Sequence, residues 1–146
     1  MKRNADIGRF TGPSKKEQAL TQLLFVTPDR SSFADLSSAI KKQGGIISWA
    51  ATGRQAREAI CETTVDLVLT DERLDDMSGL ELIKQLVADN PMINCAAISS
   101  LSKEAYHEAS EGLGILMQLP PSPDGADGER LMAHLNQILG LTKSDR

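Results

Sequence analysis

Asp71 is the residue around which the chemistry of this sequence can be organised. It follows a short apolar run over residues 67–69, and Gly79 then opens a segment with apolar residues at helical spacing. This order is typical of a buried strand, a turn and an amphipathic helix. An acid at the carboxyl end of a buried strand lies where open α/β sheets bind their ligands. Taken alone, however, such an acid is more often a solvated loop residue or a helix cap.

Three other strand ends carry residues that a parallel sheet would bring to the same crevice. They are Thr27-Pro28-Asp29, Ser99-Ser100 and Leu119-Pro120. The carboxyl ends of parallel strands converge on one edge of the sheet, so these residues and Asp71 are the first candidates for a site.

The cysteines and histidines offer no comparable site. Cys61 and Cys95 lack the spacing of a metal site, and each lies in an aliphatic segment. We therefore expect two reduced, buried thiols. His107 and His134 fall on expected helices without a carboxylate partner in sequence, which argues against histidine phosphotransfer.

Five short apolar runs, each followed by a helical pattern, would position the candidate residues. The expected strands cover residues 23–26, 46–51, 66–70, 93–98 and 115–119. The expected helices cover about 33–40, with a cap at Ser31 or Ser32, then 53–60, 79–88, 102–109 and, after a Pro/Gly/Asp loop, 131–139. The strands are apolar on both faces, which requires a parallel sheet with helices on each side. We predict a flavodoxin-like α/β sandwich with strand order 2-1-3-4-5.

Composition and charge indicate one domain and exclude several classes of protein. A chain of 146 residues with 40% hydrophobic content can form a single core. We expect a flexible basic arm over residues 1–20, a domain over 21–141 and a polar tail over 142–146. The net charge of −4 gives no general attraction to nucleic acid or to an anionic membrane.

The basic arm and the absence of long apolar runs limit the cellular context. Only Phe10 is interleaved with the five basic residues of the arm, so we expect a solvated segment and no nucleic-acid site. No apolar run approaches the ~18 residues of a membrane span, and the start of the chain lacks the apolar region of a secretory signal. We expect a cytoplasmic protein.

The loop that begins at Asp71 resembles that of response regulator receiver domains in two-component signalling. In that family the third strand ends in a phosphoacceptor aspartate, which opens a loop of the form D-x-R-L-P-x-M-x-G. This chain has, in register, Asp71, Arg73, Leu74, Met77 and Gly79, with Asp75 at the proline position. The resemblance covers residues from about 22 to 140.

The resemblance implies roles for the other strand ends. Asp71 would be the phosphoacceptor, and Ser99 would be the hydroxyl that bonds the phosphoryl group and switches conformation. The proline at 120 matches a family proline that commonly follows a cis peptide bond, so we expect a cis Leu119–Pro120 bond.

Several departures from the family pattern weaken the expected site. The family's two adjacent acids after strand one, which hold Mg²⁺, are Thr27 and Pro28 here, and Asp29 would need a local bulge to turn inward. Asp71 and the backbone carbonyl of Arg73 are then the remaining metal ligands, which predicts only a weak Mg²⁺ site and no other cofactor.

Strand five lacks two further family residues. The lysine that pairs with the phosphoryl group is Leu119, and the switch aromatic is Leu116. By analogy with the loss of one preorganised donor, the missing lysine costs roughly 3 kcal/mol, about a hundredfold in rate.

Two functions follow, and neither makes the protein an enzyme. The first is a stand-alone receiver in a phosphorelay, with Asp71 as acceptor, a sensor histidine kinase or other signalling protein as partner, and output through a partner protein. The second is a pseudo-receiver that acts as a phosphorylation-independent interaction module. Flavin or nucleotide binding is a weaker alternative, because the loop after strand one lacks the glycines of a phosphate loop. The resemblance leaves a homodimer open, because receivers often pair through their last helices.

Overall fold

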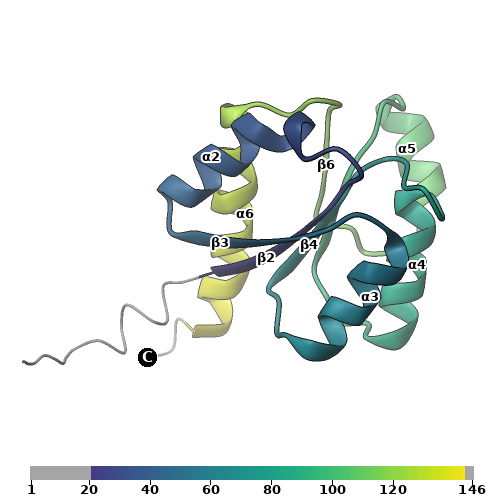
Figure 1. The fold of residues 1–146 in the computed structure, drawn as a ribbon, viewed down its shortest axis with the longest axis horizontal. Helices are drawn as coiled ribbons and strands as arrows, with labels where there is room; N and C mark the ends of the chain where they lie inside the picture. The colour runs from purple at the N-terminus through teal and green to yellow at the C-terminus, as the bar shows by residue number, and fades with distance from the viewer. Residues whose placement is uncertain (1–20, 144–146) are drawn as a thin grey trace, which may run out of the picture.

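The computed structural model describes residues 21–143, with side chains described to residue 140 (Figure 1). The strands are β2 (Thr21–Val26), β3 (Gly45–Ala50), β4 (Leu67–Thr70), β5 (Cys95–Ile98) and β6 (Met117–Leu119). The helices are the short 3-10 helix η1 (Arg30–Phe33), α2 (Ala34–Lys42), α3 (Gly53–Glu62), α4 (Gly79–Asp89), α5 (Lys103–Ser110) and α6 (Gly125–Lys143). The predicted arm over residues 1–20 and residues 144–146 lie outside the described part.

The strands form one parallel five-stranded sheet in the order β3-β2-β4-β5-β6. This is the predicted order 2-1-3-4-5, and the flavodoxin-like fold is confirmed. β2 lies between β3 and β4, and Val26 pairs with both Ala50 and Thr70. Because these three residues end their strands, Thr27 and Asp71 follow side by side at the carboxyl edge of the sheet.

Side chains alternate between the two faces of the sheet, and each face is covered by helices. Leu23 and Phe25 of β2 pack with α2 and α6, whereas Leu24 and Val26 pack with α3, α4 and α5. Figure 1 shows the same division, with α2 and α6 on one side of the sheet and the other three helices opposite. The strands read as continuous apolar runs because both faces are buried in this way.

Two cores of different character result. The core on the α2/α6 side contains an aromatic group, in which the Trp49 ring packs edge-on against Phe25 at 5.3 Å between centroids. The Arg30 guanidinium lies 5.0 Å from the centre of the same indole. These contacts make Trp49 a packing residue of this core.

The prediction of two buried thiols is right for Cys95 and wrong for Cys61. Cys95 is buried in β5, and burial raises the pKa of its thiol to about 12. Cys61 is exposed. It lies five residues after Ala56, a buried residue of α3, and this spacing rotates it well away from the side of the helix on which Ala56 lies.

Two helix starts differ from the expected ones because carboxylates cap them. Asp29, rather than a serine, caps η1: its carboxylate accepts hydrogen bonds from the backbone N–H and the hydroxyl of Ser31 at 3.1 and 2.6 Å. α6 begins at Gly125, inside the segment expected to be a loop. Asp124 and Asp127 each accept a hydrogen bond from the backbone N–H of the other, a reciprocal cap that starts the helix early.

The expected cis bond before Pro120 is wrong, because the described residues contain no cis peptide bond. Trans is the lower-energy isomer by about 0.5–1 kcal/mol. Leu119 is fully buried in the core on the α2/α6 side of the sheet.

No helix in residues 21–143 is long and apolar enough to cross a membrane.

Gly79→Ala tests how tightly the Asp71 loop closes on α4. A Cβ at Gly79 would overlap the backbone carbonyl oxygen of Asp71 and lie 3.0 Å from the Thr70 methyl carbon. We expect the free energy of unfolding in urea to fall by about 2–3 kcal/mol. Gly140→Ala is the matched control: apart from its chain neighbours and the backbone of its own helix, no atom lies within 4 Å of its Cβ position, so it should gain about 0.5–1 kcal/mol. Equal effects at the two positions would contradict the close approach.

Candidate functional site

Asp71 is positioned by the pairing of β4 with β2. Its backbone N–H donates to the carbonyl oxygen of Val26 at 2.8 Å, which continues the ladder one residue past the strand. The half-buried side chain therefore lies next to Thr27. One carboxylate oxygen, Oδ2, accepts a hydrogen bond from the Thr27 hydroxyl at 2.7 Å. The other, Oδ1, accepts one from the backbone N–H of Glu72 at 2.8 Å.

Thr27 lies at the position that the resemblance assigns to the first acid of the family's pair, and its contacts are those of a hydroxyl. Its side chain is buried, with 2% exposure, and its backbone N–H donates to the Ala50 carbonyl oxygen at 2.9 Å. The hydroxyl has one proton and can donate to one of two nearby oxygens. Its contact with Asp71 is shorter than its 3.2 Å contact with the Asp29 carbonyl oxygen, so Asp71 is the better acceptor. The hydroxyl oxygen also accepts from the Asp29 N–H at 3.0 Å. A neutral hydroxyl thus binds Asp71 directly where the family places a metal-binding acid.

The groups around Asp71 that could act as metal ligands do not fit a resident Mg²⁺. The neighbouring acid, Asp29, caps η1 with its carboxylate, and Pro28 is exposed. Both oxygens of Asp71 already accept hydrogen bonds. Within residues 21–143 there is no group of three or more His, Cys, Asp or Glu side chains that could hold a metal ion. Mg²⁺ requires near-octahedral oxygen ligands, usually anchored by one or two carboxylates, and a single engaged carboxylate is a poor anchor.

Ser99 lies at the end of β5, the neighbour of β4. It is buried, with 5% exposure, and its backbone N–H donates to the Leu119 carbonyl oxygen at 2.9 Å. Its hydroxyl oxygen accepts from the backbone N–H of Leu101 at 3.1 Å. The sheet therefore brings Asp71 and Ser99 to adjacent strand ends, as predicted, while the Ser99 oxygen is engaged within its own loop.

Two residues that the sequence did not identify fix this loop. The Glu72 carboxylate oxygen Oε2 accepts from both the backbone N–H and the hydroxyl of Ser100, each at 3.0 Å. From β6, the Gln118 side-chain amide donates to the carbonyl oxygens of Ser99 at 3.4 Å and Leu101 at 3.2 Å. No pattern in the sequence distinguishes Glu72 from the other acids of its loop, because its role depends on the position of the β5–α5 loop.

The far end of the Asp71 loop is fixed to helix α3. The Asp76 carboxylate accepts hydrogen bonds from the backbone N–H groups of Gly53 at 2.9 Å and Arg54 at 3.0 Å. The bond from Gly53 is the largest of the influences that lower the pKa of Asp76 below its usual value. Met77 packs against Gly53, where a Cβ would lie 2.6 Å from the methionine sulfur. The Arg73 side chain, in contrast, is exposed.

A small cavity lies between the two loops. Its volume is about 190 Å³. It is lined by Glu72, Arg73, Ser78, Leu80, Ile98, Ser99 and Leu101. The site as a whole thus combines the carboxylates of Asp71 and Glu72, the buried hydroxyls of Thr27 and Ser99, and a set of hydrogen-bonded loops. β6 supplies no lysine, and its Leu119 is buried in the core.

Comparison with known proteins agrees with this geometry. A family model described as the response regulator receiver domain matches residues 23–120. The chain belongs to the response regulator receiver family. Two-component signalling is therefore the context of this domain.

Curated relatives are longer proteins. The chain is 34% identical over 121 residues to the transcriptional regulatory protein ZraR of Escherichia coli O157:H7, an alignment that covers 82% of this chain and 26% of the relative. It is 29% identical over 114 residues to the response regulator protein VraR of Staphylococcus aureus, of which it covers 54%. The chain thus spans between a quarter and about half of the length of these relatives.

Solved structures share the fold at lower identity. The chemotaxis response regulator CheY4 of Vibrio cholerae superposes with a TM-score of 0.71 at 15% identity, covering 80% of this chain and 98% of that one. A signal receiver domain of an HD domain-containing protein from Pseudomonas fluorescens Pf-5 gives 0.71 at 18% identity, covering 97% of this chain and 98% of that one.

Thr27→Val tests the hydrogen bond to Asp71. Valine keeps the shape of the side chain and removes the donor, so the carboxylate loses a bond that it accepts in a half-buried place. We expect the free energy of unfolding at neutral pH to fall by about 1–3 kcal/mol, measured in urea. Thr27→Ser keeps the hydroxyl and should lose clearly less. A valine variant as stable as the unchanged protein would show that this bond does not hold Asp71.

Proposed function

We propose that this receiver domain acts as a phosphorylation-independent interaction module, in which hydrogen bonds within the chain hold the Asp71 pocket in one conformation. The observation that carries the proposal is the bond from the Thr27 hydroxyl to Asp71 at 2.7 Å. In receiver domains that accept a phosphoryl group, this place belongs to a metal-binding acid. Here a neutral donor satisfies the carboxylate, and the pocket needs no cation for its stability.

The chemistry of phosphoryl transfer supports the same proposal. Transfer depends on positioning and on neutralising the charge of the transferred oxygens. This pocket has no acid pair to hold Mg²⁺, and Leu119 in place of lysine supplies no positive charge. The loss of one preorganised donor alone costs roughly 3 kcal/mol, about a hundredfold in rate. Transfer to Asp71 should therefore be slow on the time scale of signalling.

Phosphoryl transfer to Asp71 is the second candidate function, and one observation favours it. Asp71 and Ser99 lie at the ends of neighbouring strands, beside a loop that keeps Arg73, Met77 and Gly79 in the family's positions. In that case Asp71 accepts a phosphoryl group from a sensor histidine kinase, and Ser99 responds to it. Mg²⁺ would bind weakly, at Asp71 and the Arg73 carbonyl.

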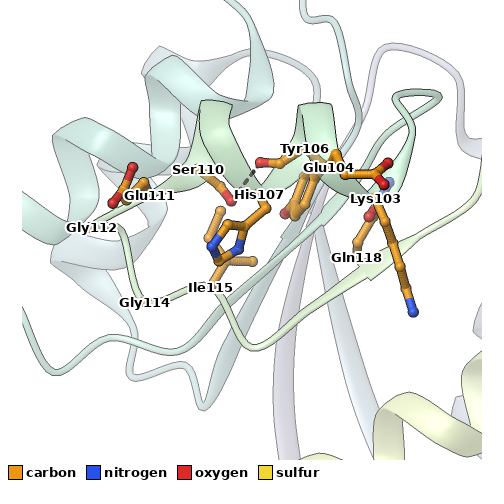
Figure 2. Close-up of a pocket in the computed structure, with 10 residues that line it drawn as sticks. All are labelled: Lys103, Glu104, Tyr106, His107, Ser110, Glu111, Gly112, Gly114, Ile115 and Gln118. Atoms are coloured by element: carbon orange, nitrogen blue, oxygen red, sulfur yellow. Dashed lines mark hydrogen bonds between the residues drawn. The ribbon is translucent and has the colours of Figure 1, made fainter.

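A partner protein would bind the surface formed by α5, β6 and α6, as in relatives. A groove of about 780 Å³ lies between α5 and β6 in this surface (Figure 2). Its lining carries the charged side chains of Lys103, Glu104 and Glu111, together with the polar side chains of His107 and Gln118. The mixture of charges fits a protein partner, whether a kinase or another signalling protein, better than a nucleic acid or a membrane.

Tyr106 forms part of the floor of this groove and carries an unsatisfied hydroxyl. The residue is 8% exposed, and its hydroxyl has no hydrogen-bond partner within the described residues. Burial, and then the neighbouring Cys95, raise the pKa of Tyr106 to about 12. The hydroxyl therefore stays a protonated, unused donor at neutral pH, which costs stability in the free domain.

Treatment with acetyl phosphate and millimolar Mg²⁺ separates the two functions. Under the main proposal we expect no added phosphoryl mass, unchanged Trp49 fluorescence and unchanged amide hydrogen exchange across α5 and β6. Trp49 suits this purpose because it precedes Ala50, whose carbonyl accepts the Thr27 N–H. The measurements are intact mass spectrometry, fluorescence and hydrogen exchange.

Asp71→Asn is the control for this experiment. A phosphoryl mass present in the unchanged protein and absent from the asparagine variant would overturn the main proposal in favour of the second. Ser99→Ala then tests the switch, since a working receiver would keep the added mass but lose the change in hydrogen exchange.

Tyr106→Phe tests the cost of the unsatisfied hydroxyl. Phenylalanine fills the same space without a buried donor, so we expect the free energy of unfolding in urea to rise by about 1 kcal/mol. A fall in stability would instead mean that the hydroxyl makes a hydrogen bond in solution, and that the floor of the groove differs from the one described.

A further inference from the structure

The loop from Ser99 to Leu101 is held from two sides and from within. On one side lies Glu72, from the loop after β4, and on the other lies Gln118, from β6. Within the loop, the Ser99 hydroxyl oxygen accepts the Leu101 N–H at 3.1 Å. An exposed segment between a strand and a helix would otherwise be free to adopt several conformations.

The contact from Glu72 contains the shortest hydrogen bonds of this set. One carboxylate oxygen accepts both the N–H and the hydroxyl of Ser100, each at 3.0 Å. Hydrogen bonds to an ionised group are stronger than bonds between neutral groups. The two donors of Ser100 converge on one oxygen, which is how a loop would bind an anion.

Gln118 connects the same loop to the partner groove. Its side-chain amide donates to two carbonyl oxygens of the loop, and the residue also lines the groove between α5 and β6 (Figure 2). The position of the Gln118 side chain therefore depends on the loop, and the wall of the groove depends on Gln118.

We propose that the Glu72 carboxylate is a built-in anion that fixes the β5–α5 loop in the conformation a partner recognises, in place of a phosphoryl group on Asp71. Glu72 is a positioning residue, which acts through Ser100 and Gln118 on the shape of the groove. This inference rests on the proposed function, because a loop fixed by the chain itself needs no phosphoryl group. It extends that function by naming the residue that sets the active shape.

Amide hydrogen exchange measured by NMR on the full chain tests the proposal. In Glu72→Ala the amides of Ser100 and Leu101 should exchange about tenfold faster or more, and the Gln118 side-chain amide resonances should shift. Glu72→Gln keeps one acceptor without the charge and should give an intermediate rate. The matched control is Asp75→Asn, which removes one charge from an exposed residue of the same loop and should leave these amides unchanged.

Anion rescue distinguishes a charge effect from simple loss of packing. In Glu72→Ala, sodium acetate at several hundred millimolar should restore most of the protection of the Ser100 and Leu101 amides, and sodium chloride at equal ionic strength should not. Equal exchange in the two salts would overturn the assignment of Glu72 as a built-in anion. Unchanged exchange in Glu72→Ala without salt would also overturn it, because Gln118 and Ser99 would then hold the loop alone.

Failure of this inference is separable from failure of the proposed function. The hydrogen-exchange results depend only on Glu72 and its loop, whereas the acetyl phosphate experiment depends on Asp71. A phosphoryl mass on Asp71 would overturn the proposed function whatever the rates in the Glu72 variants. Normal exchange in Glu72→Ala with no mass on Asp71 would overturn the inference and leave the proposed function supported.

Discussion

The hydrogen bond between Thr27 and Asp71 is the interaction on which the rest of this site depends. Adjacent carboxylates repel one another, so a receiver pocket with three acids is stabilised when a cation binds between them. A buried threonine lowers that repulsion. It binds the remaining carboxylate with a neutral donor and continues the β2 pairing at the same time, since its N–H bonds the Ala50 carbonyl oxygen. The residue that follows β2 is therefore hydrogen-bonded both to the end of β3 and to the residue that follows β4.

With a neutral donor bonded to Asp71, the loops around the pocket are held by groups of the protein. Asp76 holds the start of α3, and Glu72 and Gln118 hold the segment from Ser99 to Leu101. A receiver that switches must pass between two arrangements of these loops, and an effector can shift that equilibrium only by its difference in affinity for the two. Moving a 1:99 population to 99:1 needs about 5.5 kcal/mol. Several intact hydrogen bonds in one arrangement raise that requirement, which favours a single conformation.

The sequence predicted the fold well because the relevant signal is regular. The expected strands are short runs that are apolar on both faces, and they alternate with segments of helical periodicity. Few parallel topologies fit this pattern, and those topologies place β4 beside β5. Asp71 and Ser99 were found for the same reason: each directly follows such a run. Glu72 and Gln118 were not found, because their roles depend on side chains that cross between loops. The cap at Asp29 and the early start of α6 were missed because nearby carboxylates accept backbone N–H groups there. The cis bond before Pro120 was expected from the family resemblance alone, and the bond has the lower-energy trans form.

When residues of a reactive site are replaced by residues that pack or bond within the protein, the stability of the fold usually rises. Residues that perform chemistry usually cost stability, because charges must be desolvated and donors left unpaired until the ligand binds. At the two positions that the resemblance assigns to the family's first acid and to its lysine, this chain has a buried threonine with its hydroxyl bonded and a leucine with no exposed surface. Thr27 thus satisfies the Asp71 carboxylate with a neutral donor, and Leu119 supplies no cation to it. Within the described part of the chain, the buried polar side-chain atom that lacks a hydrogen-bond partner is the Tyr106 hydroxyl, which lies at the groove between α5 and β6. The unpaired donor therefore lies at the surface where we propose that a partner binds, whereas both oxygens of Asp71 at the carboxyl edge of the sheet accept hydrogen bonds.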